Sequence, residues 1–206
     1  MRKEVYKSVQ GRKIVESRYR EILALPIWSP FEELFVSTHV ARTHVLRFGE
    51  PAKPPLLMLH GSASNSAVWL GNVAAFLDHF CAYCVDIPGE PGLSEPVRCG
   101  LHTDEPQRWL LSLMDALGLG VCSFATMSLG SWYALNVAIH APGRVRAISM
   151  LTAPGLVPAK KSFLLLAILC AMLGTIHSWR RSRYSKMLRS EEFGRACNSL
   201  AATTTR

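Results

Sequence analysis

The sequence predicts an α/β fold with a mostly parallel sheet, helices on both faces of that sheet, and an antiparallel hairpin at its start. Three observations predict this class. Short apolar runs of strand length alternate along the chain with segments whose apolar residues recur at helical spacing. Pro and Gly residues separate these segments. A hydrophobic fraction of 49% in 206 residues is typical of one globular domain.

The first half of the core is expected to open with two antiparallel strands. Residues 34–40 and 43–48 alternate polar and apolar side chains, which is the pattern of a hairpin with one solvated face. The continuous apolar run 56–59 indicates a strand that is buried on both faces, as in a parallel sheet. From residue 66 to residue 80 the apolar side chains recur at helical spacing, which predicts one helix.

The alternation continues through the second half of the core. The expected elements are a strand over 82–87, a helix from Thr103-Asp104 to Gly118, a strand over 121–125, a helix over 129–140 and a strand over 145–151. Consecutive strand, helix and strand units of this kind form parallel sheets with right-handed crossovers.

Two segments of different character flank the predicted core, which spans residues 29–156. Residues 1–28 are charged and helical in pattern, and they predict an N-terminal helical arm. Residues 157–206 lose the alternation, so we expect the start of a cap or lid region there, with an apolar helix and a basic tail that frays. The apolar stretch 163–176 is shorter than the ~20 residues of a spanning helix. Contact with a membrane surface is the less favoured alternative, based on flanking basic residues.

The net charge of +8 lies at the two ends of the chain. Residues 1–20 hold seven Lys or Arg against two Glu, residues 157–206 hold nine against two, and the middle carries a net negative charge. Nucleic-acid binding favours a basic face interleaved with aromatic residues in the folded core, and the sequence shows no such interleaving. We therefore expect no nucleic-acid partner.

Six scattered cysteines without regular spacing favour reduced thiols and a cytoplasmic protein. Cys81 and Cys84 form C-x-x-C, but they lie in a strand-like run, whereas redox pairs need a helix start that lowers the thiol pKa. No second pair completes a zinc site, so we expect no metal and no cofactor. The charged N-terminus lacks the apolar stretch of a signal peptide.

Ser128 is the candidate nucleophile. It lies in Thr126-Met127-Ser128-Leu129-Gly130-Ser131, between a predicted strand and a predicted helix, which is the position of a nucleophile elbow. The sharp turn requires small residues two positions before and after the serine. Gly130 meets this requirement, whereas Thr126 is β-branched where the usual motif has Gly. On these residues alone, a serine that only caps the helix is equally compatible.

The loop His60-Gly61-Ser62 follows the buried strand 56–59 and precedes a helix, which is the position of a loop that supplies an oxyanion donor. The backbone N–H groups of Ser62 and Leu129 are therefore the candidate oxyanion hole. We expect His60 and Gly61, together with Thr126 and Gly130, to support the site structurally, and His60 to pack the loop rather than act as a base.

A third marker is the loop Asp86-Ile87-Pro88-Gly89-Glu90-Pro91-Gly92-Leu93-Ser94, and a fourth is Pro142-Gly143-Arg144-Val145. With the Ser128 and His60 motifs, this ordered set resembles the α/β-hydrolase family, specifically its carboxylesterase-like members, over about residues 30–156. The loop of that family that corresponds to Asp86–Ser94 usually has one residue fewer before its second Gly. The resemblance implies a structural role for Asp86 and a serine hydrolase that acts on small-molecule carboxylic esters through an acyl-enzyme at Ser128.

In this family the triad acid and histidine follow the serine along the chain. After Ser128 the only acids are Glu191 and Glu192, and the only histidines are His140 and His177. His140 ends the helix that Ser128 starts, about 16 Å away, and His177 precedes both glutamates, the reverse of the family order. We therefore expect a C-terminally truncated family member with an incomplete fold and impaired activity. The alternative is a non-catalytic binding or interaction protein that retains the pocket.

Overall fold

A computed structural model describes residues 5–100 and 103–152 of the chain, all of which belong to one compact unit, Met1–Val157. The predicted cap region 157–206, with its apolar stretch 163–176, lies outside the described residues. Within them, no helix is long and apolar enough to cross a membrane.

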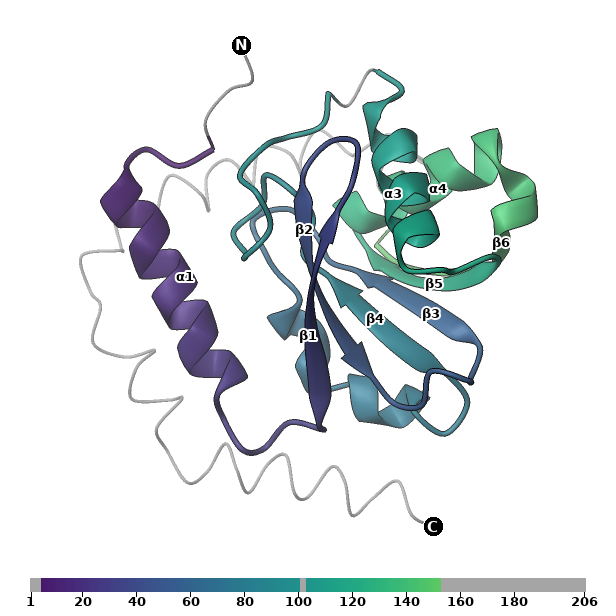
Figure 1. Ribbon diagram of the computed structural model, residues 1–206, viewed down its shortest axis with the longest axis horizontal. Helices are drawn as coiled ribbons and strands as arrows, with labels where there is room; N and C mark the ends of the chain where they lie inside the picture. The colour runs from purple at the N-terminus through teal and green to yellow at the C-terminus, as the bar shows by residue number, and fades with distance from the viewer. Residues whose placement is uncertain (1–4, 101–102, 153–206) are drawn as a thin grey trace, which may run out of the picture. The chain divides into compact units, whose positions relative to one another are not determined.

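A six-stranded sheet forms the centre of this unit (Figure 1). Its strands are β1 (Phe31–Ser37), β2 (Arg42–Phe48), β3 (Pro55–Leu59), β4 (Cys81–Val85), β5 (Cys122–Met127) and β6 (Val145–Leu151), in the order β1-β2-β4-β3-β5-β6. The pairs β1–β2 and β2–β4 are antiparallel, whereas β4–β3, β3–β5 and β5–β6 are parallel. The predicted fold class, with its initial antiparallel hairpin, is therefore confirmed.

The helices follow the prediction except between β3 and β4. They are α1 (Val9–Leu23), α2 (Ala67–Leu70), the 3₁₀ helices η1 (Val73–Phe76) and η2 (Pro142–Arg144), α3 (Glu105–Ala116) and α4 (Leu129–His140). The single helix expected over residues 66–80 is wrong, because two short helices separated by Gly71 and Asn72 occupy that segment. Gly and Asn are poor helix formers, and Gly71 is the C-cap of α2.

The sheet buries a different set of side chains on each face because successive residues of a strand point to opposite sides. Leu57 and Leu59 of β3 belong to a core that includes residues of α3 and α4. Leu56 and Met58 belong to a second core, which includes Tyr19 and Leu23 of α1 and Trp69 of α2. The helices thus cover both faces, with α1 away from α3 and α4 (Figure 1).

The described cysteines are Cys81, Cys84, Cys99 and Cys122, and all four are buried and form no disulfide. Cys81 and Cys84 lie on β4, as the strand interpretation predicted, and burial raises the pKa of the Cys84 thiol. A thiol with a raised pKa is a poor redox nucleophile. The cytoplasmic location stays a prediction.

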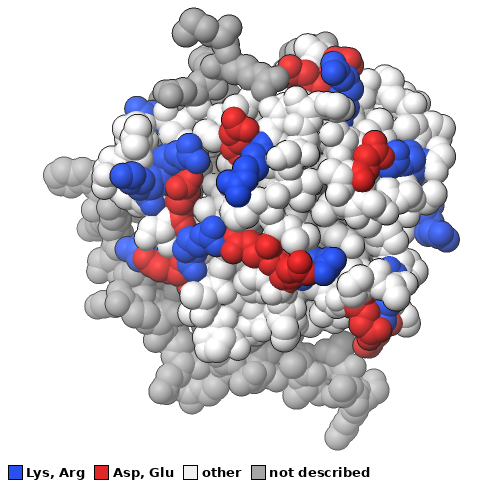
Figure 2. Space-filling view, in the orientation of Figure 1, with Lys and Arg blue, Asp and Glu red and all other residues white. Residues whose placement is uncertain are grey.

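Acidic and basic side chains intermix on the face shown in Figure 2, where blue and red residues lie beside one another. Oppositely charged neighbours also form ion pairs, among them Arg18 with Glu21 on α1 and Arg47 with Glu32 between β2 and β1. On this face the charges form no region of a single sign.

Candidate active site

Ser128 occupies a strained turn between β5 and α4. Its backbone has φ 47° and ψ −112°, a conformation that residues other than Gly rarely adopt. The Ser128 side chain makes no capping hydrogen bond to α4. Helix caps have extended backbone and bond to the first turn, so Ser128 is not a capping serine.

Backbone hydrogen bonds hold the strained residue on both sides. The Ser128 N–H donates to the carbonyl oxygens of Leu151 at 3.1 Å and Thr152 at 2.9 Å, at the end of β6. The Ser128 carbonyl accepts from the Ser131 N–H at 2.9 Å, which begins the hydrogen bonding of α4. The turn is therefore fixed between the last strand of the described sheet and the first turn of the helix.

Two glycines allow the turn to touch the loop after β3. A Cβ at Gly130 would overlap the Leu59 carbonyl oxygen and lie 2.7 Å from its carbon. The Gly130 N–H donates to the His60 carbonyl at 3.1 Å. A Cβ at Gly61 would lie 3.3 Å from the Ser128 Cβ. The structure thus brings the predicted residues 60–61 and 128–130 into direct contact.

Thr126, which stands where the family motif has Gly, is accommodated at the end of β5. Its side chain is buried, and its Oγ1 lies 2.9 Å from the Ser131 Oγ and donates to the Ser149 carbonyl at 3.2 Å. The β-branched residue precedes the strained position and keeps strand conformation. Thr126 therefore links β5 to α4 and β6 instead of crowding the turn.

His60 is fully buried and both of its ring nitrogens are engaged. Nε2 accepts from the Ile87 N–H at 2.9 Å, so the ring proton is on Nδ1, which donates to the Gly61 carbonyl at 2.7 Å. Burial lowers the pKa of His60 and keeps the ring neutral. These contacts leave neither nitrogen of His60 for proton transfer.

Asp86 anchors the far end of the loop that contains Ser62. Its Oδ1 accepts from the Ser66 N–H at 2.8 Å and the Tyr19 hydroxyl at 3.2 Å, and its Oδ2 accepts from the Leu93 N–H at 2.9 Å. Burial alone would raise the pKa of Asp86, but hydrogen bonding and charge from His44, with the Leu93 N–H, bring the pKa below its usual value. Asp86 is thus a buried, ionised structural residue.

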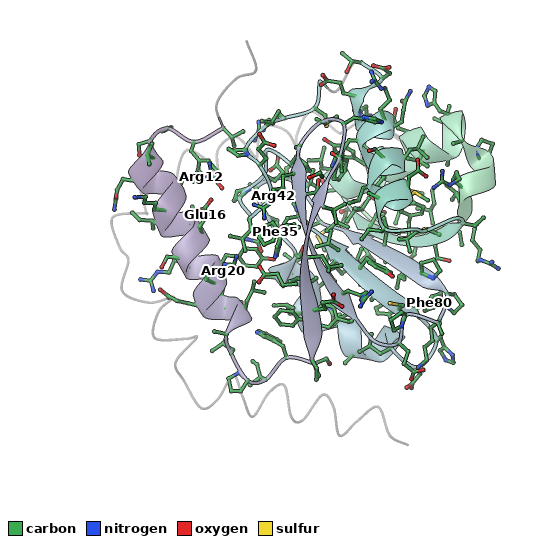
Figure 3. All side chains as sticks on the ribbon, in the orientation of Figure 1. Arg12, Glu16, Arg20, Phe35, Arg42 and Phe80 are labelled. Atoms are coloured by element: carbon green, nitrogen blue, oxygen red, sulfur yellow. The ribbon has the colours of Figure 1, made fainter. Side chains whose placement is uncertain are left out.

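His44 of β2 extends this network toward α1. Its Nδ1 lies 2.8 Å from Asp86 Oδ2 and its Nε2 lies 2.8 Å from Glu33 Oε1, and the ring is completely buried. Glu33 also pairs with Arg20 of α1, which Figure 3 labels beside the sheet. Sequence reasoning missed His44 because β2 also carries Arg42, Thr43 and Arg47, so that one more polar residue in this strand gave no distinct signal.

A pocket of about 210 Å³ lies beside the serine turn. The pocket is lined by residues of the loop after β3, of the loop after β4 and of α4, and these include the residues of both predicted oxyanion donors. The lining residues are Ser62, Ala63, Pro88, Glu90, Arg98, Cys99, Leu129 and Tyr133. Among the described residues, the N–H groups of Ser62 and Leu129 have no hydrogen-bond acceptor. The structure therefore leaves two free amides at one pocket.

Comparisons with known proteins agree with this geometry. A family model described as the alpha/beta hydrolase fold matches residues 54–181. Carboxylesterase YbfK from Bacillus subtilis is 35% identical over 59% of this chain and 42% of its own length. The uncharacterized carboxylesterase nap from the same organism is 31% identical over 59% of this chain and 40% of its own length.

The crystal structure of carboxylesterase CesB (YbfK) from Bacillus subtilis superposes with a TM-score of 0.70 at 29% identity. The match covers 78% of this chain and 56% of that structure. This chain therefore spans about half the length of the relatives that it matches.

Gly130→Ala is expected to destabilise the protein by about 2 kcal/mol, because the new methyl group must displace the Leu59 carbonyl. Gly71→Ala is the matched control, since a Cβ there meets no heavy atom within 4 Å and φ is −72°. Its effect should stay within about 0.5 kcal/mol. Urea unfolding measures both free energies. Equal losses in the two variants would contradict the close approach.

Asp86→Asn should lower the free energy of unfolding by about 3 kcal/mol at pH 7, because it removes one partner of a buried ionic network. Because the pKa of Asp86 is lowered in the fold, the ionised carboxylate stabilises the protein at pH values above the ordinary carboxyl pKa of 3.8. This contribution is lost as the pH falls below 3.8 and through the lowered pKa. The difference between wild type and variant should therefore shrink below about pH 4 in urea unfolding series.

The exposed Asp78 supplies the control for this experiment. Asp78→Asn should change the free energy of unfolding by less than about 0.5 kcal/mol. A difference between wild type and Asp86→Asn that stays constant down to pH 2 would show that the charge of Asp86 does not stabilise the fold.

Proposed function

We propose that this chain, which belongs to the α/β-hydrolase family, uses Ser128 as the nucleophile of an esterase acting on small carboxylic esters. One observation carries the proposal: Ser128 has a strained backbone at the start of α4, beside a pocket lined by Ser62 and Leu129, whose N–H groups have no acceptor among the described residues. Strain of this kind concentrates at catalytic residues. The similarity to carboxylesterases supports an ester as the substrate class.

The chemistry proposed for this site is acyl transfer. The Ser128 Oγ attacks the ester carbonyl carbon, and the carbonyl oxygen gains a negative charge that the N–H groups of Ser62 and Leu129 stabilise. The bond to the alkoxy group then breaks, the alcohol leaves with a proton, and the acyl group stays on Ser128. Water hydrolyses this acyl-enzyme and releases the carboxylic acid. Removal of one oxyanion donor typically slows such reactions by about 10² to 10³.

The proton of Ser128 needs a base, and neither His60 nor His140 is available for this task. His60 has both ring nitrogens engaged, and His140 at the end of α4 bonds to the Asn136 carbonyl at 2.8 Å. His177 lies outside the described residues. Loss of the histidine from a serine triad reduces turnover by about 10⁶. We therefore propose that this chain turns esters over slowly.

The second candidate function is non-catalytic binding of a small ester or a related ligand in the same pocket. It is favoured by the Ser128 side chain, which makes no hydrogen bond to another described residue. An activated serine is normally held by its base. The two candidates differ in the reactivity of Ser128 and not in the shape of the pocket.

A fluorophosphonate probe distinguishes them. The esterase proposal expects covalent labelling at Ser128, located by mass spectrometry of the digested protein, and complete loss of labelling in Ser128→Ala. Ser131→Ala is the matched control, because Ser131 is a buried serine of the same helix that bonds to Thr126. That variant should retain labelling.

Circular dichroism must show that each protein is folded. Folded wild-type protein that resists the probe would refute the esterase proposal for this chain and leave ligand binding as its function. Labelling of Ser128 together with slow release of p-nitrophenol from p-nitrophenyl acetate would agree with a competent nucleophile that lacks an efficient base.

A further inference from the structure

We infer that Glu90 is a positioning residue for the oxyanion loop, defined as residues 60–63, and that it holds the Ser62 amide toward the pocket. The inference rests on the proposed function for its catalytic consequence. Glu90 is 6% exposed, although it lies in a loop rich in Pro and Gly. A buried carboxylate needs partners because an unpaired buried charge is strongly unfavourable.

The main partner of Glu90 is the backbone of the oxyanion loop. Its Oε2 accepts from the Ala63 N–H at 2.6 Å. Ala63 has φ 56°, a left-handed conformation that residues other than Gly seldom adopt. A charge-assisted hydrogen bond is about twice as strong as a neutral one and can offset the cost of this conformation. Glu90 therefore stabilises the strained residue that directly follows Ser62.

The loop after β4 reaches the oxyanion loop through residues between its two glycines. The segment Gly89-Glu90-Pro91-Gly92 has two residues between the glycines, where the related motif usually has one. Glu90 contacts Ala63, and the Pro91 carbonyl accepts from the Asn65 side-chain amide at 2.8 Å. The longer loop thus contributes two contacts to the segment around Ser62, one to the Ala63 backbone and one to the Asn65 side chain.

Two carboxylates from this loop fix both sides of the segment after β3. Asp86 accepts from the Ser66 N–H at 2.8 Å, and Glu90 accepts from the Ala63 N–H at 2.6 Å. The Gly61 carbonyl is held by His60. The Ser62 N–H lies between these bonded groups and has no acceptor among the described residues. The surrounding bonds therefore fix the backbone on both sides of the Ser62 amide.

Arg98 offsets the charge that Glu90 brings to the pocket. Its Nη2 lies 3.3 Å from Glu90 Oε1, and its Nε donates to the Gly89 carbonyl at 3.1 Å. A lone carboxylate beside an oxyanion would oppose the developing negative charge. Pairing with Arg98, which is 62% exposed, brings the net charge at this position close to zero. Glu90 can then position the loop without repelling the transition state.

The first test measures the rate at which a fluorophosphonate labels Ser128 in the full chain. The dependence of this rate on probe concentration separates the maximal labelling rate from the probe affinity. Glu90→Ala should lower the maximal rate about tenfold or more, because the Ser62 amide loses its alignment, and leave the probe affinity nearly unchanged. Glu90→Gln should recover most of the rate, since its side-chain oxygen can still accept from the Ala63 N–H.

Glu95→Ala is the matched control, because Glu95 is a carboxylate of the same loop whose Oε2 accepts from the Arg42 N–H at 2.9 Å, outside the pocket lining. This variant should label at the wild-type rate. Glu90→Asp keeps the charge but withdraws the carboxylate by one methylene, so it should label slowly even if Glu90→Ala does not fold. Labelling of a folded Glu90→Ala or Glu90→Asp at the wild-type rate would overturn the inference.

The second test is amide hydrogen exchange of Ala63 by NMR, which needs no reactivity. The protection factor should fall at least tenfold in Glu90→Asp and stay near the wild-type value in Glu90→Gln and Glu95→Ala. If the probe does not label wild type, the esterase proposal fails while this exchange still decides the role of Glu90. Loss of protection then supports positioning of the loop, and unchanged protection in Glu90→Asp refutes it.

Discussion

The site depends on one close approach between two backbones. The start of α4 lies directly against the end of β3, with the Gly130 N–H bonded to the His60 carbonyl and no space for a side chain at residue 130. Parallel pairing of β3 with β5 makes this possible, because it brings the carboxyl ends of both strands to the same edge of the sheet. The strained serine, the loop after β3 and the pocket between them all follow from this contact.

The neighbouring strand β4 supplies the polar groups that keep this arrangement in place. Because β4 pairs with β3 on the side opposite β5, its carboxyl end lies at the same edge, and the loop that follows it carries Asp86 and Glu90. Both carboxylates bond to backbone N–H groups of the loop after β3. Asp86 also connects through His44 and Glu33 to α1, so a helix distant from the serine in the chain shares its supporting network.

Local patterns predicted the elements well where a single periodicity extends through the whole segment. The helix over residues 129–140 and the strand over 145–151 have the bounds that the pattern predicted. The helix expected over 66–80 failed because its apolar spacing continues across Gly71 and Asn72, where one short α-helix ends and a 3₁₀ helix begins. Glu90 was missed for a different reason: its partner Ala63 lies 27 positions away, and no periodicity encodes the path of a Pro- and Gly-rich loop.

The shared hydrogen bond of Ser128 has a consequence for sequence variation. The serine N–H is divided between the carbonyls of two consecutive residues, Leu151 and Thr152. Only main-chain oxygens take part, and both side chains are exposed. Leu151 should therefore be free to change in residue type, whereas Thr152, at φ 57°, should favour residues that tolerate the left-handed conformation. The course of the backbone should stay under strict selection at both positions. An insertion or deletion there would disturb the nucleophile more than any exchange of side chains at the same place.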